Sequence, residues 1–437
     1  MTALTWGILG CIVLLILLMS SMPVAFAMAV VGLLGFACVT NPNAAMALVT
    51  TDLYDTISNK SLTVIPLFIL MGQVAFHAGI SRRLYDAAYK WFGSLPGGMA
   101  MATIGACTGF GAICGSGPAT SATMAAVALP EMKRFKYNME LAAGSVAAGG
   151  SLGMLIPPSV VFIVYAIMAE QSVGELFLAG ILPGLLIAGL FCLTIFINCI
   201  RRPELGPPGP KTSIKDKLLA LGGILETALL FLLVIGGMFL GFFTPTEAAA
   251  VGAFGSLMIA LAKRRLSFKM LSRSLRETVR TSCMVMIIVA GATMFSHFLA
   301  ITQIPMRLAD WLSNLPLPAV LVMGMIILFY LLAGCFVDAL ALVLLTITIF
   351  QPVVQGLGFD LVWFGVIIVV VTQMGVITPP VGVCAYIVTG IAPDVPLQTV
   401  FKGALPFLAA LIVAAILLIA FPQISLWLPQ LMAEGGK

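Results

Sequence analysis

Two segments that combine a glycine with tandem prolines are the residues best suited to chemistry in this 437-residue chain. A proline lacks a backbone N–H, so a tandem pair breaks a helix and frees the carbonyls that would have accepted from it. Free carbonyls at a helix break suit a small hard cation such as sodium, which prefers oxygen ligands. The two segments run from Gly153 to Pro158 and from Gly375 to Pro380, and the second adds the Thr378 hydroxyl.

Two short turns between apolar half-helices could face these breaks. The first, 112–121, has glycines for a tight turn, three hydroxyls as oxygen ligands, and a half-helix that begins near Pro118, whose N-terminal amides could receive a carboxylate. The second, 334–338, ends at Asp338. An acid inside a membrane is costly and usually functional, but it could equally be the N-cap of the following half-helix. Both interpretations of Asp338 stay open.

The composition places these segments in a membrane. Hydrophobic residues make up 61% of the chain and charged residues only 9%, whereas soluble domains carry about 25% charged residues. The net charge of +5 resides in short basic clusters between apolar segments, which indicates membrane topology and not nucleic-acid binding. Nine cysteines without a CxxC pair and two histidines argue against zinc or redox chemistry, so no organic cofactor is expected.

An intramembrane serine hydrolase is the alternative from a different class. Cys114-Gly115-Ser116-Gly117 resembles a nucleophile turn, but the Gly-x-Ser-x-Gly spacing is absent. The chain also has no HExxH motif and no P-loop. We therefore do not expect an enzyme.

Lys and Arg clusters orient the membrane spans, because they mark cytoplasmic loops. The resulting alternation puts the N-terminus outside and treats 41–61, which holds Asp52, as an outer loop. Two regions, 97–132 and 317–353, are interrupted near the middle and are predicted to be re-entrant hairpins. The predicted spans lie near 3–20, 23–40, 62–79, 138–169, 175–200, 218–242, 244–262, 281–302, 360–391 and 398–421.

A shift of 222 residues superimposes one half of the chain on the other, because Pro23 falls on Pro245 and Pro157-Pro158 on Pro379-Pro380. The loop 131–137 holds three basic residues and its counterpart 353–359 holds none, so the copies are predicted to be inverted. Inverted repeats with paired broken helices are typical of secondary transporters with a midplane site. The predicted fold is an all-α polytopic membrane protein with an inverted repeat, two re-entrant helical hairpins and two broken helices. A passive channel remains the alternative, and saturable, sodium-dependent uptake would separate the two.

Several motifs, in this order along the chain, resemble the large membrane subunit of the TRAP (tripartite ATP-independent periplasmic) transporters. The motifs are Ser116-Gly117-Pro118-Ala119-Thr120-Ser121, Leu129-Pro130-Glu131-Met132, Leu152-Gly153-Met154-Leu155-Ile156-Pro157-Pro158, Gly180-Ile181-Leu182-Pro183-Gly184, Thr244-Pro245-Thr246-Glu247 and Thr378-Pro379-Pro380-Val381-Gly382. One departure is Cys114, where related proteins often carry serine.

The resemblance implies sodium-coupled import of an organic acid, such as a C4-dicarboxylate, sugar acid or sialic acid, across the bacterial inner membrane by an elevator motion. It implies two further chains, a small four-helix membrane subunit and a periplasmic substrate-binding protein. The implied division is scaffold 1–96, transport domain 97–200 with broken helix 138–169, cytoplasmic linker 201–217, scaffold 218–316, transport domain 317–422 with broken helix 360–391, and C-terminal tail 423–437.

The resemblance also implies two sodium sites, each between a hairpin tip and the neighbouring break. The first would use Cys114, Ser116, Gly153, Ile156 and Pro158, and the second Val337, Asp338, Gly375, Thr378 and Pro380. The substrate would contact Ser116, Gly117, Thr120, Pro157 and Pro379.

Overall fold

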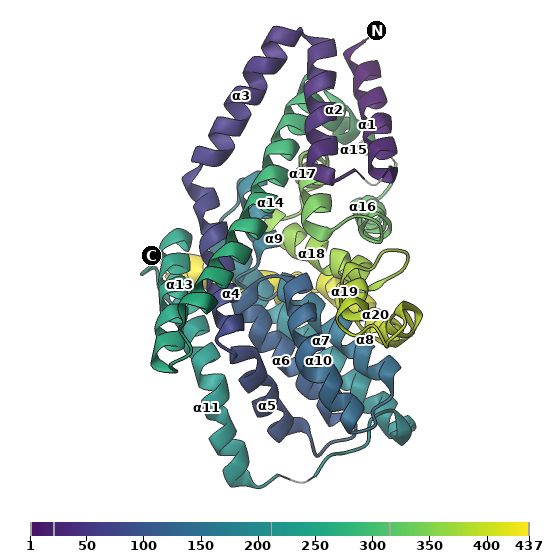
Figure 1. The fold of residues 1–437 in the computed structure, drawn as a ribbon. Helices are drawn as coiled ribbons and strands as arrows, with labels where there is room; N and C mark the ends of the chain where they lie inside the picture. Colours follow the sequence, from purple (N-terminus) through teal and green to yellow (C-terminus); the bar gives the residue numbers. More distant parts are fainter. Residues whose placement is uncertain (1, 21, 211, 314–315, 436–437) are drawn as a thin grey trace.

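A computed structural model describes residues 2–20, 22–210, 212–313 and 316–435 (Figure 1). Every regular element in these ranges is a helix, and seven of the helices there are long and apolar enough to cross a membrane. The prediction of an all-α polytopic membrane protein is therefore confirmed. Lys211 of the predicted linker, residues 314–315 at the end of the predicted scaffold and the last two residues of the predicted tail lie outside the described residues.

The segments predicted to form the scaffold contain long helices, one of them 35 residues in length. They are α1 (Ala3–Met19), α2 (Val24–Val39), α3 (Pro42–Ser58), a 3-10 turn (Lys60–Thr63), α4 (Val64–His77), α5 (Ile80–Phe92), α11 (Ile214–Phe231), a π turn (Leu232–Gly236), α12 (Gly237–Phe239), α13 (Pro245–Ala262), α14 (Phe268–Thr302) and α15 (Ile304–Ser313).

The segments predicted to form the transport domain combine two long helices, of 29 and 24 residues, with several short ones, and two of the helices end at glycine. The elements are α6 (Gly98–Cys114), α7 (Gly117–Arg134), α8 (Met139–Ser151), a 3-10 turn (Leu152–Met154), α9 (Val160–Met168), α10 (Val173–Arg201), α16 (Ala319–Gly334), α17 (Ala339–Gly356), α18 (Leu361–Ile377), α19 (Val383–Ile391) and α20 (Leu397–Ala420). The predicted linker contains a 3-10 turn (Pro203–Leu205), and the predicted tail contains α21 (Gln423–Gly435). A helix thus ends and a new one begins inside both predicted hairpins and inside both predicted broken helices, at the positions that their glycines and prolines predicted.

The two halves of the chain interlock, because α8 of the first half packs directly on α20 of the second. Gly144 and Gly403 form the crossing, and a Cβ on Gly403 would lie 1.8 Å from the Glu140 carbonyl oxygen. Only glycine allows the two backbones to approach so closely. Helices α6, α7 and α8 pack on one another and α16 packs on α18, so each hairpin lies against a broken helix (Figure 1).

An ion pair joins the C-terminal end of α7 to the loop before α20. Lys133, in the last turn of α7, donates to the Asp394 carboxylate, and this hydrogen bond lowers the pKa of Asp394. The contact puts the loop 131–137 and the loop 392–396 on the same side of the protein.

The stretch 41–61, predicted to be an outer loop, is helical along most of its length. This stretch forms α3, whose N-cap Asn41 accepts from Ala44 N at 2.8 Å and whose first position is Pro42. The helix packs on α2 and α14. Asp52 is buried and its carboxylate accepts a hydrogen bond from His297 Nδ1 at 3.0 Å. The acid faces a neighbouring helix and not solvent, which the low hydropathy of the segment did not indicate.

One other boundary differs from the prediction, and two segments contain features that were not predicted. The span expected at 281–302 is the C-terminal part of the longer helix α14. This helix begins at Phe268, where Ser267 caps it, and the basic side chains on its first turns are exposed. The span expected at 218–242 is present as the continuous helical stretch Ile214–Phe239, within which Leu232–Gly236 forms a π turn. The predicted tail contains α21, which packs on α10.

Candidate functional site

The first hairpin tip is a two-residue turn held against the first broken helix. Gly115 closes α6 with φ +64°, and its carbonyl accepts from Val160 N at 3.2 Å. Ser116 caps α7, and the Thr120 hydroxyl donates to the Ser116 carbonyl at 2.8 Å. A Cβ on Gly115 would lie 2.2 Å from the Pro158 carbonyl oxygen. The left-handed conformation and this close approach both require glycine at position 115.

The break itself supplies the other face of this contact. After α8 the chain forms a 3-10 turn, passes through the cis Pro157-Pro158 bond and restarts as α9, which Ser159 caps. A Cβ on Gly153 would lie 2.6 Å from Thr120 Oγ1 and 2.9 Å from the Ser116 carbonyl oxygen. Oxygen atoms of the tip therefore approach the backbone of the break, which is the ligand type that sodium needs.

The second tip and the second break pack in the same manner. Asp338 caps α17 by accepting from Leu340 N at 3.1 Å, which confirms the capping interpretation of this residue. The Cys335 carbonyl accepts from Val381 N at 3.2 Å, and a Cβ on Gly375 would lie 2.4 Å from the Gly334 carbonyl oxygen. Thr378 donates to the Met374 carbonyl at 2.6 Å, and the Pro379-Pro380 bond is cis.

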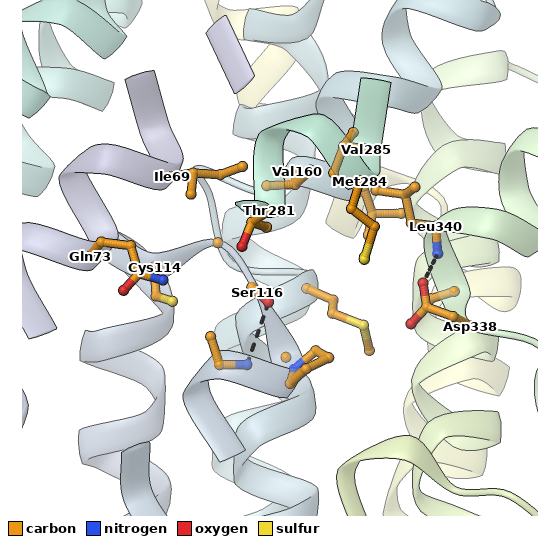
Figure 2. Close-up of a pocket in the computed structure, with 17 residues that line it drawn as sticks. Ile69, Gln73, Cys114, Ser116, Val160, Thr281, Met284, Val285, Asp338 and Leu340 are labelled. Atoms are coloured by element: carbon orange, nitrogen blue, oxygen red, sulfur yellow. Dashed lines mark hydrogen bonds between the residues drawn. The ribbon is translucent and has the colours of Figure 1, made fainter. Parts of the chain in front are cut away.

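A cavity of about 290 Å³ separates the two tips (Figure 2). The N-terminal turns of α7 and α17 both open onto it, through Ser116 to Ala119 and through Asp338 to Leu340. The opposite wall comes from α4 and α14, which contribute Gln73 and Thr281. Two helix N-termini direct their positive dipole ends into this space, which favours an anion, while the caps Ser116 and Asp338 accept from amides of the first turns. Among the described lining residues Asp338 is the single charged side chain.

The cavity collects some of the residues singled out in the sequence and leaves others outside. Cys114, Ser116, Gly117 and Asp338 line it. The remaining candidate residues do not line the cavity. The contact of the first tip with its break contains Gly153, Thr120 and Pro158, and the contact of the second tip contains Gly375. Pro157 is buried, Val337 is half-buried, and Pro379 and Pro380 are exposed. Thr378 donates a hydrogen bond within its own helix, and Ile156 faces Gly184 of α10.

Sequence reasoning missed the wall opposite the tips. Gln73 and Thr281 lie in helices read as plain spans, although Gln73 is a lone polar residue in an apolar run. It also missed Gln373 in α18, five residues before Thr378. Gln373 is fully buried, and both polar atoms of its amide lack a hydrogen-bond partner. As with Gln73, the sequence signal for Gln373 is a polar residue in an apolar helix, because Gln373 is one of two polar residues in α18.

Comparisons with known proteins identify the family. A family model described as the DctM component of the tripartite ATP-independent periplasmic transporters matches residues 11–424. The chain belongs to the TRAP transporter large permease family. Membership makes it a multi-pass inner-membrane permease and not an enzyme, and implies secondary transport of organic acids together with a small membrane subunit and a periplasmic binding protein.

Two relatives and one solved structure illustrate the match. The C4-dicarboxylate TRAP transporter large permease protein of Pseudomonas aeruginosa is 38% identical, over 86% of this chain and 88% of its own length. The sialic acid TRAP transporter large permease protein of Vibrio cholerae is 33% identical, over 96% and 98%. The crystal structure of the Alcanivorax borkumensis YdaH transporter shares the fold with a TM-score of 0.64 at 14% identity, covering 89% of this chain and 90% of that one.

Proposed function

We propose that this TRAP permease imports an organic acid by sodium symport, with the substrate held in the cavity between the two hairpin tips. The observation that carries the proposal is the meeting of two helix N-termini in one cavity whose described lining has an acid but no basic side chain. The positive dipole ends of α7 and α17 would attract the carboxylate. No lysine or arginine of the described lining would neutralise it, so co-bound cations have that role.

Sodium would bind where each tip meets its break. At the first contact the Ser116 carbonyl and Thr120 hydroxyl approach Gly153, and at the second the Gly334 carbonyl approaches Gly375. These are neutral or weakly charged oxygen ligands, which suit a monovalent hard cation. Asp338 begins the half-helix beside the second contact and would add a negative charge there. Binding of sodium would thus order both tips around the substrate.

Movement of 97–200 and 317–422 against 1–96 and 218–316 would carry the substrate across as an elevator. The cavity supports this division, because the hairpin tips form one wall and α4 and α14 form the other. Sliding of the first wall past the second would open the cavity to the other side of the membrane. The proposed site needs no rearrangement inside the transport domain for this step.

The substrate class follows from the relatives, which are named for C4-dicarboxylates, sialic acid and isethionate. All of these are small organic acids. We propose that a periplasmic binding protein delivers the substrate and that a small membrane subunit supports the scaffold. A thermal-shift screen of the binding protein encoded beside this permease would identify the acid.

The test is uptake of that acid into proteoliposomes that contain both membrane subunits, with the loaded binding protein outside. The proposal predicts initial rates that saturate with the loaded binding protein and rise with external sodium. The alternative is a channel or uncoupled permease for small organic anions. Rates that grow linearly with substrate and ignore sodium would favour it and refute symport.

A further inference from the structure

A second cavity, of about 370 Å³, lies away from the substrate cavity, between the ends of α8, α10 and α20. Its lining is polar, unlike that of the space between the tips. It contains Arg201 and Arg202 from the end of α10 and Lys402 from the first turns of α20. Glu140 at the start of α8 and Asn198 complete the polar lining. The cations come from segments 200 residues apart, so the fold and not the local sequence brings them together.

The charges of this cavity are unbalanced. Arg201, Arg202 and Lys402 are exposed, and within the part of the chain that the structure describes none of the three forms an ion pair. Against them stands the single carboxylate of Glu140, so the cavity carries a formal charge of +2. Uncompensated cations that converge on one concave site favour a ligand with about two negative charges.

The position of the cavity fits the membrane surface. It lies at the basic C-terminal end of α10. It also lies at the start of α8, which follows the segment 131–137 that is predicted to be cytoplasmic. Large apolar side chains next to the cations remain exposed, with Ile200 at 55% and Leu405 at 56%. A ligand there would meet cations at its head and apolar helix surface beside them, as a phospholipid does.

We propose that this cavity binds the headgroup of an anionic phospholipid of the inner leaflet, with a diphosphate lipid of the cardiolipin type as its best ligand. The two arginines would hold one phosphate and Lys402 would hold the other. The acyl chains would lie along the exposed face of α10 and α20. Because Lys402 and the arginines belong to opposite halves of the chain, the lipid would brace the two halves at their cytoplasmic ends, beside the Gly144–Gly403 crossing.

Lipid-dependent thermal unfolding of the delipidated, full-length protein in neutral detergent tests this proposal. Added cardiolipin should raise Tm, phosphatidylglycerol should raise it less, and phosphatidylcholine should leave it unchanged. The triple variant Arg201→Gln, Arg202→Gln, Lys402→Gln should lose the response to cardiolipin. Each cation near a headgroup strengthens binding about fivefold, so the half-saturating lipid concentration should rise by about 100-fold in the triple variant.

A matched variant removes the same charge elsewhere. Lys269, Arg276 and Arg280 are exposed cations on α14, outside the cavity, and Lys269→Gln, Arg276→Gln, Arg280→Gln should keep the full response. An equal loss in this control would refute a defined site. Inorganic phosphate added alone should not raise Tm, and a rise that depends on the same three cations would show a site for free phosphate in place of a lipid. Native mass spectrometry of the wild-type chain should retain one cardiolipin, and its absence would overturn the proposal independently of any variant.

Discussion

At the scale of single residues, few polar groups are available to hold a charged substrate. The cavity between the tips offers Ser116, Gln73 and Thr281, together with the carboxylate of Asp338. Asp338 has two possible roles, and the structure shows one of them, the cap on α17. Gln373 is the opposite case, because its buried amide has no partner at all. Each residue can be tested by a substitution that changes charge or polarity while keeping shape.

Asp338→Asn separates the cap from the charge, because asparagine caps a helix as well as aspartate does. If the carboxylate contributes to a sodium site, the sodium concentration for half-maximal uptake should rise by more than about tenfold. Uptake into proteoliposomes at varied sodium measures this. Asp360→Asn is the control, because Asp360 caps α18 by accepting from Trp363 N at 2.8 Å and lies outside the cavity. Unchanged sodium dependence in Asp338→Asn would leave only the capping role.

Gln373→Met tests whether the unpartnered amide serves transport. Burying an unpaired amide costs about 1–3 kcal/mol, so methionine of similar shape should stabilise the protein by roughly that amount. Uptake should nevertheless fall by about tenfold if the amide forms hydrogen bonds with the substrate or with a hydrated ion during the transport cycle. Gln351→Met is the control, since that side chain already bonds to the Ala169 carbonyl at 3.2 Å. Full activity in Gln373→Met would contradict a transport role.

At the scale of elements, the sequence predicts breaks better than it predicts helices. Tandem prolines and glycines stop a helix for local reasons, so both broken helices and both tips fall where they were expected. The position of Gln73 opposite the tips depends on tertiary packing, because a hydropathy pattern does not record which helix lies opposite. The start signal of α3 was present in Asn41-Pro42, but the charges of the segment favoured a loop.

Gly153→Val tests the contact of the first tip with its break. A Cβ there would lie 2.6 Å from Thr120 Oγ1, so valine must push the tip away from the break. Displacement by about 1 Å should lower uptake by about 100-fold, while the protein still inserts into the membrane. Gly189→Val on α10 is the control, because nothing lies within 4 Å of the Cβ it would add. Normal transport by Gly153→Val would refute the proposed first sodium site.

Glu226→Gln tests the ion cluster that ties α11 to α5 and α13. The Glu226 carboxylate lies 2.8 Å from Arg83 Nη1 and 2.8 Å from Lys263 Nζ, with the glutamate side chain only 11% exposed. Glutamine would leave two cations without a counter-charge. Because both cations are partly solvated, we expect a loss of about 2 kcal/mol, less than for a fully buried pair. Thermal unfolding measures it, and Glu131→Gln, which weakens an exposed pair with Arg134, should change almost nothing.

At the scale of the whole molecule, two halves of similar sequence meet around one cavity and interlock through α8 and α20. The scarcity of charge extends to the cavity between the tips, so under the proposed function an acidic substrate would be held by helix ends and hydroxyls and would depend on co-bound cations. This dependence on cations would couple sodium to substrate. Without sodium, the Asp338 carboxylate would give the cavity a negative charge that repels an acidic substrate. Sodium and substrate should therefore bind together or not at all.

Concentrative uptake tests this account most directly. Proteoliposomes with both membrane subunits, supplied with the loaded binding protein, are given an inward sodium gradient, and the internal concentration of the acid is followed. The account predicts accumulation above the external concentration and its collapse when a sodium ionophore removes the gradient. Equilibration to the same internal level with and without the gradient would contradict it.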